Sequence, residues 1–308
     1  MDCKKLFGIN FSFKRKLYLV FLFMIFSSRI MAQDDLSNLL NDLEPKKREF
    51  VTATFKGTRL INFHTIETLG KRCLDFRISH HFGDLNGGPY QFFGMDGGAS
   101  IRFALEYTYD GRLQGGLGRS SLEKTYDGFL KYRLIRQAIG KPIPISVTLV
   151  ASMFYNTTKD PNIAQDGFDR YQYASNRMSY AYQIIIARKF SPSFSFQVAP
   201  VMVHFNLVDN IGDKNDMYAL AFATRCKLTK RMAVTAEYAK RLTQFTTSQV
   251  YYDSAGLGLD IETGGHVFQV YVTNSLGQIE NQFIPRTTSS WKNMGIKLGF
   301  NISRAFRI

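Results

Sequence analysis

The chain has 308 residues and a formal net charge of +14, with 39 Lys and Arg against 25 Asp and Glu. Its three cysteines are too few for a disulfide framework, and a mean hydropathy of −0.16 argues against a bundle of membrane-spanning helices. A basic balance suits nucleic-acid binding, but the first residues predict export, and an exported protein rarely meets nucleic acid.

Residues 1–32 have the layout of a secretory signal peptide. Lys14, Arg15 and Lys16 precede the apolar run LYLVFLFMIF at 17–26, and Met-Ala-Gln follows at 31–33. The alternative is a membrane anchor, but a spanning helix needs ~20 apolar residues, about twice the length of this run. We therefore predict cleavage after Ala32. It would remove six Lys and Arg and one Asp, which lowers the formal charge to about +9.

Residues 33–49 are predicted to form a short periplasmic amphipathic helix and a linker. Acidic residues suit the start of this helix, and Pro45 ends it. Helical spacing places four leucines on one face: Leu36, Leu39, Leu40 and Leu43. This face could bind a periplasmic or membrane protein, or the helix could remain a loosely attached terminus. Both interpretations stay open.

Segment 50–72 contains FVTATFKGTRLINFHTIETLG, which precedes the first clear strand and has no strand partner of its own. It is too apolar to remain in solution. We expect it to pack at or inside the periplasmic mouth of the domain that follows, partly plugging it.

From residue 73 onward, apolar and polar residues alternate. In LDFRISHHF the side chains of Leu74, Phe76 and Ile78 share one face, and Asp75 and Arg77 lie on the other. A period of two predicts half-buried strands. We predict about twelve strands, near 73–82, 99–109, 112–120, 125–136, 144–155, 172–189, 194–208, 217–228, 232–242, 255–262, 266–274 and 291–303.

The two faces of these strands predict a membrane barrel. The apolar faces are rich in Phe, Tyr, Ile and Leu, whereas the polar faces mix Gly, Ala and charges of both signs. Outer-membrane barrels have an apolar outside and a polar lumen, and they close on themselves because backbone groups cannot stay unpaired in lipid. The sequence therefore predicts an all-β fold: a closed antiparallel transmembrane β-barrel over residues 73–308, in contact with outer-membrane lipid.

The connections between strands alternate in length. Tight turns such as Asp110-Gly111 alternate with longer, polar links at 84–98, 156–170 and 275–290. Short turns lie on the periplasmic side of such barrels and long loops lie outside. With twelve strands, both termini are expected in the periplasm of a Gram-negative bacterium.

Three stretches resemble one family. They are ATFKGTRLINFHTIETLGKRCLDFRISHHFGDLNGG at 53–88, GRSSLEKTYDGFLKYRL at 118–134 and GIKLGFNISRAF at 295–306. Together they are similar to an uncharacterised family of Bacteroidota outer-membrane β-barrels, over roughly residues 50–306. The resemblance implies the fold and the location. It carries over no functional residues, because the family has no established activity.

Motifs that suggest chemistry have simpler explanations. His80 and His81 are neighbours in a strand, so they point to opposite faces and cannot share a metal. GGLGRSS at 115–121 imitates a phosphate loop but lacks the following helix, and glycines in a strand can let a facing side chain pack closely. The His-x-Ser signature of outer-membrane phospholipases is absent. We expect neither an enzyme nor a cofactor or metal site.

Strand parity directs a set of charged residues into the lumen: Asp75, Arg77, Arg102, Glu106, Asp127, Lys131, Arg133, Arg177, Arg225, Glu237, Arg241, Asp260, Glu262 and Lys297. Buried charges must be paired or hydrated. They either line a narrow water path or form a solid core. We expect a narrow porin-like channel for small polar or anionic solutes. The alternative is a non-conducting membrane anchor or scaffold for a periplasmic partner complex, and a membrane-embedded enzyme is less favoured.

Overall fold

The computed structural model describes residues 48–139, 142–159, 170–210, 212–245, 249–263 and 266–308. The predicted signal peptide and the predicted helix with Leu36, Leu39, Leu40 and Leu43 lie outside these residues. Among the described residues, no helix has both the length and the apolar character needed to cross a membrane.

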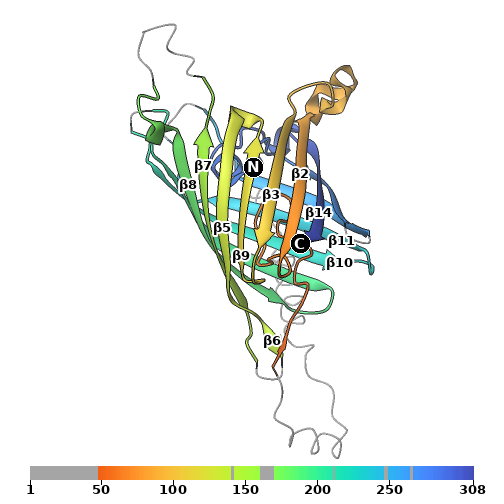
Figure 1. Cartoon of the computed structure of the whole chain (residues 1–308). Helices are drawn as coiled ribbons and strands as arrows, with labels where there is room; N and C mark the ends of the chain where they lie inside the picture. The colour runs from red at the N-terminus through yellow and green to blue at the C-terminus, as the bar shows by residue number, and fades with distance from the viewer. Residues whose placement is uncertain (1–47, 140–141, 160–169, 211, 246–248, 264–265) are drawn as a thin grey trace, which may run out of the picture. The chain divides into compact units, whose positions relative to one another are not determined.

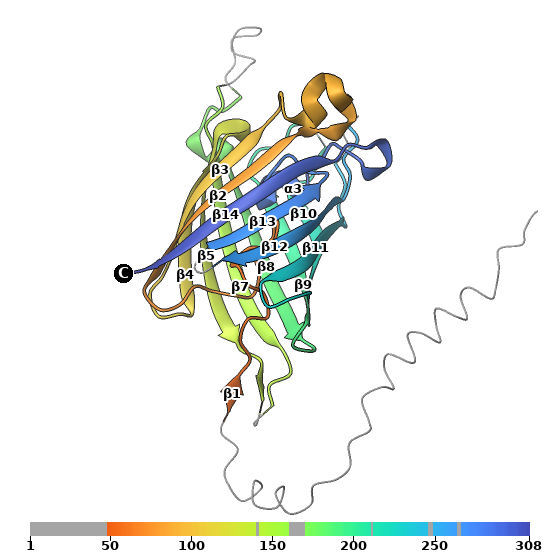
Figure 2. The same cartoon turned by 90° about the vertical axis from the view of Figure 1, so that its right-hand side faces the viewer.

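Twelve antiparallel strands form one closed barrel, which confirms the predicted fold class (Figures 1 and 2). The strands are β2 (Cys73–Asp84), β3 (Ser100–Thr108), β4 (Leu113–Ser120), β5 (Thr125–Ile135), β7 (Ser146–Asn156), β8 (Met178–Lys189), β9 (Phe194–Phe205), β10 (Asp216–Lys227), β11 (Met232–Arg241), β12 (Ser254–Thr263), β13 (His266–Thr273) and β14 (Lys297–Arg307). Each strand pairs with its neighbour in the chain, and β14 pairs with β2 to close the ring. No barrel strand is left with an unpaired edge.

The last strand starts later than its alternation predicts. Residues 291–296 continue the apolar and polar pattern of β14, yet Trp291–Asn293 form a short 3-10 helix, η4, and Met294 has a left-handed φ of 54°. A left-handed residue cannot continue an extended strand. β14 therefore begins at Lys297.

The two ends of the barrel differ in their connections. At one end, here called the turn end, residues 109–112, 190–193 and 228–231 join the strands. Also at this end, β1 (Glu49–Phe50) pairs with β6 (Ala138–Ile139) in a separate two-stranded sheet. The other end, here called the loop end, carries residues 85–99 and 274–296, which include η1 (Leu85–Gly94) and α3 (Glu280–Phe283).

The outer face of the barrel is apolar and exposed. Leu105, Leu117, Leu130 and Ile184 project outward from four different strands. In a membrane this surface is covered by lipid chains, which is how an exposed apolar belt becomes stable.

The inner face of the barrel has two halves. Charged, amide and hydroxyl side chains line β2–β5 and β12–β14, among them Arg102 and Lys131. Alanine and branched apolar side chains line β8–β10, among them Ala199, Val201 and Ala221. The polar lumen expected from parity is thus found on one half of the wall only.

Two segments that are not strands of the barrel fill its lumen. Residues 51–72, here the plug segment, bury Phe55, Leu60 and Phe63. Residues 274–296, here the inner loop, bury Ile279 and Phe283. These side chains form an apolar core with the inner faces of β7–β11. The link at 275–290, interpreted from sequence as a polar external loop, is therefore part of the interior, because its apolar positions pack on the apolar half of the wall.

Candidate functional site

The plug segment folds into a hairpin that reaches deep into the barrel. Leu60 N donates to the Phe63 carbonyl and Thr65 N donates to the Thr58 carbonyl, both at 2.9 Å. The hairpin tip is held by the carboxylate of Glu237 on β11, which accepts from Asn62 N at 2.9 Å and from Phe63 N at 3.2 Å. Two backbone N–H groups that would otherwise be buried without partners are satisfied in this way.

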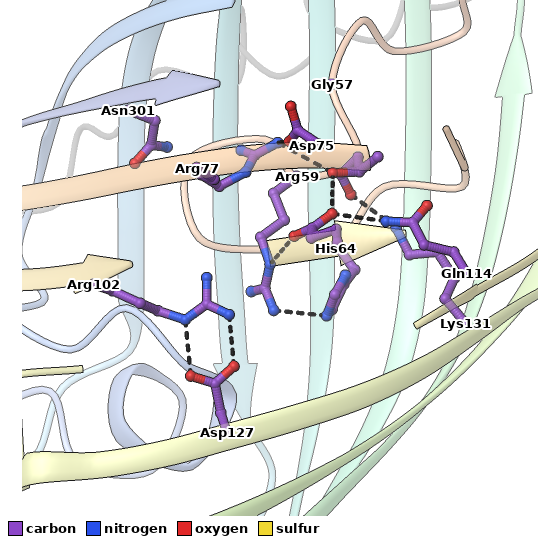
Figure 3. Close-up of polar contacts among 12 residues, drawn as sticks. Gly57, Arg59, His64, Asp75, Arg77, Arg102, Gln114, Asp127, Lys131 and Asn301 are labelled. Atoms are coloured by element: carbon purple, nitrogen blue, oxygen red, sulfur yellow. Dashed lines mark hydrogen bonds and ion pairs between the residues drawn. The ribbon is translucent and has the colours of Figure 1, made fainter. Parts of the chain in front are cut away.

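The polar half of the wall holds the base of the hairpin. Lys131 Nζ donates to the Thr58 carbonyl at 2.8 Å and to the Glu67 carbonyl at 3.0 Å. Thr58 Oγ1 donates to Glu106 at 2.8 Å, and Gln114 donates to the same carboxylate oxygen at 2.7 Å. Figure 3 shows Gln114 and Lys131 side by side next to the hairpin. Wall side chains therefore replace the strand partner that the plug segment lacks.

The plug segment and the inner loop meet at the middle of the barrel. Glu280 of the inner loop lies 3.6 Å from Arg59 Nη1 and 3.2 Å from His64 Nε2. The rings of Phe63 and Phe283 make an edge-to-face contact with centroids 4.8 Å apart. A segment from the turn end and a segment from the loop end are thus joined by both ionic and aromatic contacts.

Burial sets the protonation of this junction. The pKa of His64 is lowered from 6.5 to about 3, first by burial and then by the positive charges of Arg59 and Lys131, so the imidazole is neutral. Burial alone would raise the pKa of Glu280, but the positive charge of Arg59 is the largest opposing cause, and that pKa is held below its usual range. The junction therefore consists of an ionised carboxylate, an arginine and a neutral histidine.

A second ion pair spans the wall. Arg102 Nε donates to Asp127 Oδ1 at 2.9 Å, and Arg102 Nη2 contacts Asp127 Oδ2 at 2.5 Å (Figure 3). The pair lies over Gly118, where a Cβ atom would come within 2.6 Å of the guanidinium. At Gly116 a Cβ atom would come within 2.3 Å of the Phe129 ring. These glycines of the GGLGRSS stretch thus permit close packing and belong to a strand, not to a phosphate loop.

The structure places the charged residues chosen by parity in three groups. Asp75, Arg77, Arg102, Glu106, Asp127, Lys131, Arg133, Arg225, Glu237 and Asp260 are buried on inner faces of strands. Glu262 is half-buried at the turn end, where it pairs with Arg225 at 3.2 Å and with Lys56 at 2.8 Å. Lys297 is buried at the loop end, where its Nζ pairs with Asp84 at 2.6 Å.

Arg177 and Arg241 also lie at the loop end. Arg177 is half-buried in η3 (Ala174–Arg177), since β8 begins one residue later, and it donates to the Thr158 carbonyl at 2.7 Å. Arg241 donates to the carbonyls of Pro285 and Tyr251. The pair of carboxylates on β12 is also divided, since Asp260 accepts from Gln269 at 2.9 Å whereas Glu262 takes part in ion pairs.

Strand parity did not identify the residues where the plug segment meets the inner loop, because Arg59, His64 and Glu280 are not on barrel strands. The spacing of Ile279, Phe283 and Ile284 in the link at 275–290 was the available signal, since three large apolar residues are unexpected in an exposed loop. Nothing in the sequence connects Glu280 with Arg59 across more than two hundred residues. Only the folded barrel brings them together.

The waist of the barrel is closed to solvent in this conformation. Arg59, Arg102, Glu106, Lys131 and Glu280 are each at most 3% exposed. A cavity of about 390 Å³ lies toward the turn end and one of about 250 Å³ toward the loop end. The buried waist separates the two cavities.

The two histidines of the pair at 80–81 lie on opposite faces. His81 is buried in the lumen, with Nε2 3.0 Å from the Tyr271 hydroxyl, whereas the His80 ring stacks on Phe300 on the outer face at 5.2 Å. Within the described ranges, no three His, Cys, Asp or Glu side chains gather as they would around a metal ion.

A closed ring of antiparallel strands, apolar outside and charged on one half of its inner wall, defines an outer-membrane-type β-barrel. The chain belongs to the family of membrane-bound β-barrel domains DUF5777, whose model matches residues 55–306. The match includes the plug hairpin and all of the twelve strands except the last residue of β14.

The solved structures to which this chain is similar include two porins and an outer-membrane channel. The NanC porin is 6% identical with a TM-score of 0.47, over 76% of this chain and 100% of that chain. The KdgM porin is 8% identical with a TM-score of 0.44, over 77% and 99%. An outer-membrane channel from Pseudomonas putida F1 is 12% identical with a TM-score of 0.48, over 78% and 98%. A comparison with curated proteins gives no match.

Proposed function

We propose that the protein is a narrow porin-like channel for small polar or anionic solutes, closed in the observed conformation by the plug segment and the inner loop. The observation that carries the proposal is the charged half of the inner wall. A barrel that served only as an anchor could fill its lumen with apolar side chains, as β8–β10 do, and would avoid the cost of burying charges. A charged wall is useful where water and solutes pass.

The balance of wall charges supports a preference for anions. Eight basic and six acidic residues make up the inward-facing set chosen by parity. In a low-dielectric pore, an excess of one sign concentrates ions of the opposite sign. The hydrogen bonds that Lys131 and Glu237 make to the plug backbone are ones that water can replace, so these two wall residues do not prevent the plug segment from leaving the lumen.

The proposal includes a location and an orientation. The barrel is placed in the outer membrane of a Gram-negative bacterium after cleavage of a signal peptide at Ala32. The turn end is assigned to the periplasm, because short turns lie on that side of such barrels. Both termini would then be periplasmic, and the plug segment would enter the lumen from the periplasm.

Planar-bilayer conductance tests the channel. We expect the full chain to conduct weakly, and a variant that lacks residues 33–70 to give discrete current steps whose reversal potential in a salt gradient favours anions. Arg133→Glu in that variant should reduce the anion preference. Arg188→Glu is the matched control, because Arg188 is an exposed residue on the outer face of β8. Silence of the shortened barrel at every voltage would overturn the channel and favour the anchor.

The leucine face is proposed to bind a periplasmic or membrane protein. Leu36, Leu39, Leu40 and Leu43 precede the plug segment by few residues, so a partner held there would act on the plug. Deleting residues 33–45 should release a co-purifying protein while the barrel stays folded. A partner that still co-purifies would contradict this proposal.

A further inference from the structure

The cavity at the turn end lies on one side of the plug segment. The hairpin is tied to β3–β5 through Glu106, Gln114 and Lys131. On the opposite side, Lys56–Thr58 and Glu67–Gly70 face β2, β12, β13 and β14 across a cavity of about 390 Å³. Pockets that bind small molecules begin at about 300 Å³. The plug segment therefore leaves a space of ligand size between itself and the polar wall.

Two buried charged side chains that line this cavity have unfilled hydrogen-bonding positions. Asp75 and Arg77 on β2 are each 2% exposed. Asp75 Oδ2 and Arg77 Nε have no hydrogen-bond partner. The two side chains form an ion pair, from Arg77 Nη2 to Asp75 Oδ2, at 3.7 Å, a distance longer than a hydrogen bond. In Figure 3 the two side chains lie next to one another, on the side of the plug segment away from the Arg102–Asp127 pair.

The other charges around the cavity are already occupied. Lys56 pairs with Glu262 at 2.8 Å, and Glu67 accepts from Arg133 at 3.1 Å. Arg77 Nη2 donates to Thr58 Oγ1 at 3.1 Å, which fixes its guanidinium beside the hairpin. Asp75 and Arg77 both line the cavity, so it presents one carboxylate and one guanidinium group to a ligand.

A ligand that pairs with both Asp75 and Arg77 must carry a positively charged donor and a negatively charged acceptor close together. An α-amino acid has its ammonium and carboxylate groups on one carbon, a separation that suits two protein charges 3.7 Å apart. A simple anion would interact favourably with Arg77 but be repelled by Asp75, and a simple cation would meet the reverse, whereas a zwitterion can pair with both groups. Charge-assisted hydrogen bonds to both groups favour the zwitterion.

We propose that the turn-end cavity binds a small α-amino acid zwitterion, with its ammonium group on Asp75 and its carboxylate on Arg77. As a solute site of a channel, it rests on the proposed function. Binding is measured on the closed barrel without any current, so the binding site and the channel can each be refuted independently of the other.

Isothermal titration calorimetry of the full chain in detergent tests the site, with glycine as the probe and acetate, methylammonium and glucose as comparators. Glycine should bind at least ten-fold more tightly than each comparator. Asp75→Asn and Arg77→Gln should each weaken glycine binding ten-fold or more. Asp110→Asn is the control, because Asp110 is an exposed carboxylate in a turn at the same end, where it accepts from Leu113 N.

A variant that keeps both Asp75 and Arg77 tests the site without changing the buried charges. Ser303 on β14 also lines the cavity, and Ser303→Phe should fill the space and abolish glycine binding while leaving Asp75 and Arg77 in place. Heat-modifiable gel mobility shows that each variant is folded. Three results would overturn the site: no saturable glycine binding up to about 10 mM, glucose binding as tightly as glycine, or unchanged binding in folded Asp75→Asn.

Discussion

Gly116 shows how one missing side chain shapes the lumen. Phe129 lies over it and in turn contacts His64 of the plug segment, with ring centroids 4.6 Å apart. We predict that Gly116→Ala destabilises the barrel by about 1–3 kcal/mol, because the new Cβ atom pushes Phe129 into a filled core. The temperature at which the folded gel band converts to the unfolded band measures the change.

The neighbouring glycine provides the control for that substitution. Gly115 faces outward, and a Cβ atom there would lie 3.5 Å from Leu130, an ordinary contact. Gly115→Ala should leave the transition temperature nearly unchanged. Equal effects of the two substitutions would show that Phe129 does not depend on Gly116.

His64 makes docking of the plug segment sensitive to acid. Its pKa is about 3 in the folded barrel and 6.5 when the residue is exposed, so the docked state binds fewer protons between these values. The stabilisation is complete above pH 6.5 and decreases as the pH falls toward 3, by about 2 kcal/mol at pH 5. Limited proteolysis of the plug segment should therefore accelerate from pH 7 to pH 5. His64→Gln should flatten this profile, whereas an unchanged profile would exclude His64 as the cause.

At the scale of elements, local alternation predicted the strands because, in one half of the barrel, each strand has apolar residues on its outer face and polar residues on its inner face. Asp75 and Arg77 alternate with Leu74 and Phe76 in this way, and β2 begins where predicted. On β9, by contrast, Val201 and Val203 face inward while Pro200 and Met202 face outward, so that both faces are apolar. The sequence VAPVMV carries that signal, but apolar residues on both sides do not reveal what covers the inner one.

The occupants of the lumen depend on contacts between distant residues. Glu237 accepts from Asn62, and Glu280 contacts Arg59, although each pair is separated by more than 170 positions in the chain. Strand parity directs Glu237 inward but does not identify its partner. The candidate site could therefore be predicted as a list of wall charges, whereas its centre required the folded chain.

Glu280 is predicted to couple the inner loop to the plug segment. Glu280→Ala removes the carboxylate that faces Arg59 and His64, and breaking a buried ion pair costs about 3–5 kcal/mol. Hydrogen–deuterium exchange should rise across residues 55–66 and 279–284 and remain unchanged in β3 and β4. Asp216→Ala is the control, because Asp216 pairs with His204 at the outer rim of the loop end. Unchanged protection of residues 55–66 would show that the two segments dock independently.

At the scale of the whole molecule, the ring of strands and its contents are stabilised by different interactions. The ring is closed by backbone hydrogen bonds from β2 to β14, and its outer face is adapted to lipid. The contents are held by side chains such as Lys131, Glu237 and Asn301, which donate to or accept from the plug backbone. In the described part of the chain, no strand pair of the ring includes a residue of the plug segment or the inner loop.

We therefore predict that a chain lacking residues 51–70 still forms a barrel, with β-dominated circular dichroism in detergent and a heat-modifiable gel band. Its transition temperature should be lower, because Phe55, Leu60 and Phe63 no longer cover the apolar wall and Glu106 and Lys131 lose their plug partners. Heating the full and shortened chains in parallel measures the difference. The full-length Gly115→Ala variant serves as the reference for a change that leaves the lumen intact. A shortened chain that never acquires the folded band would show that the plug segment is required for the ring to close.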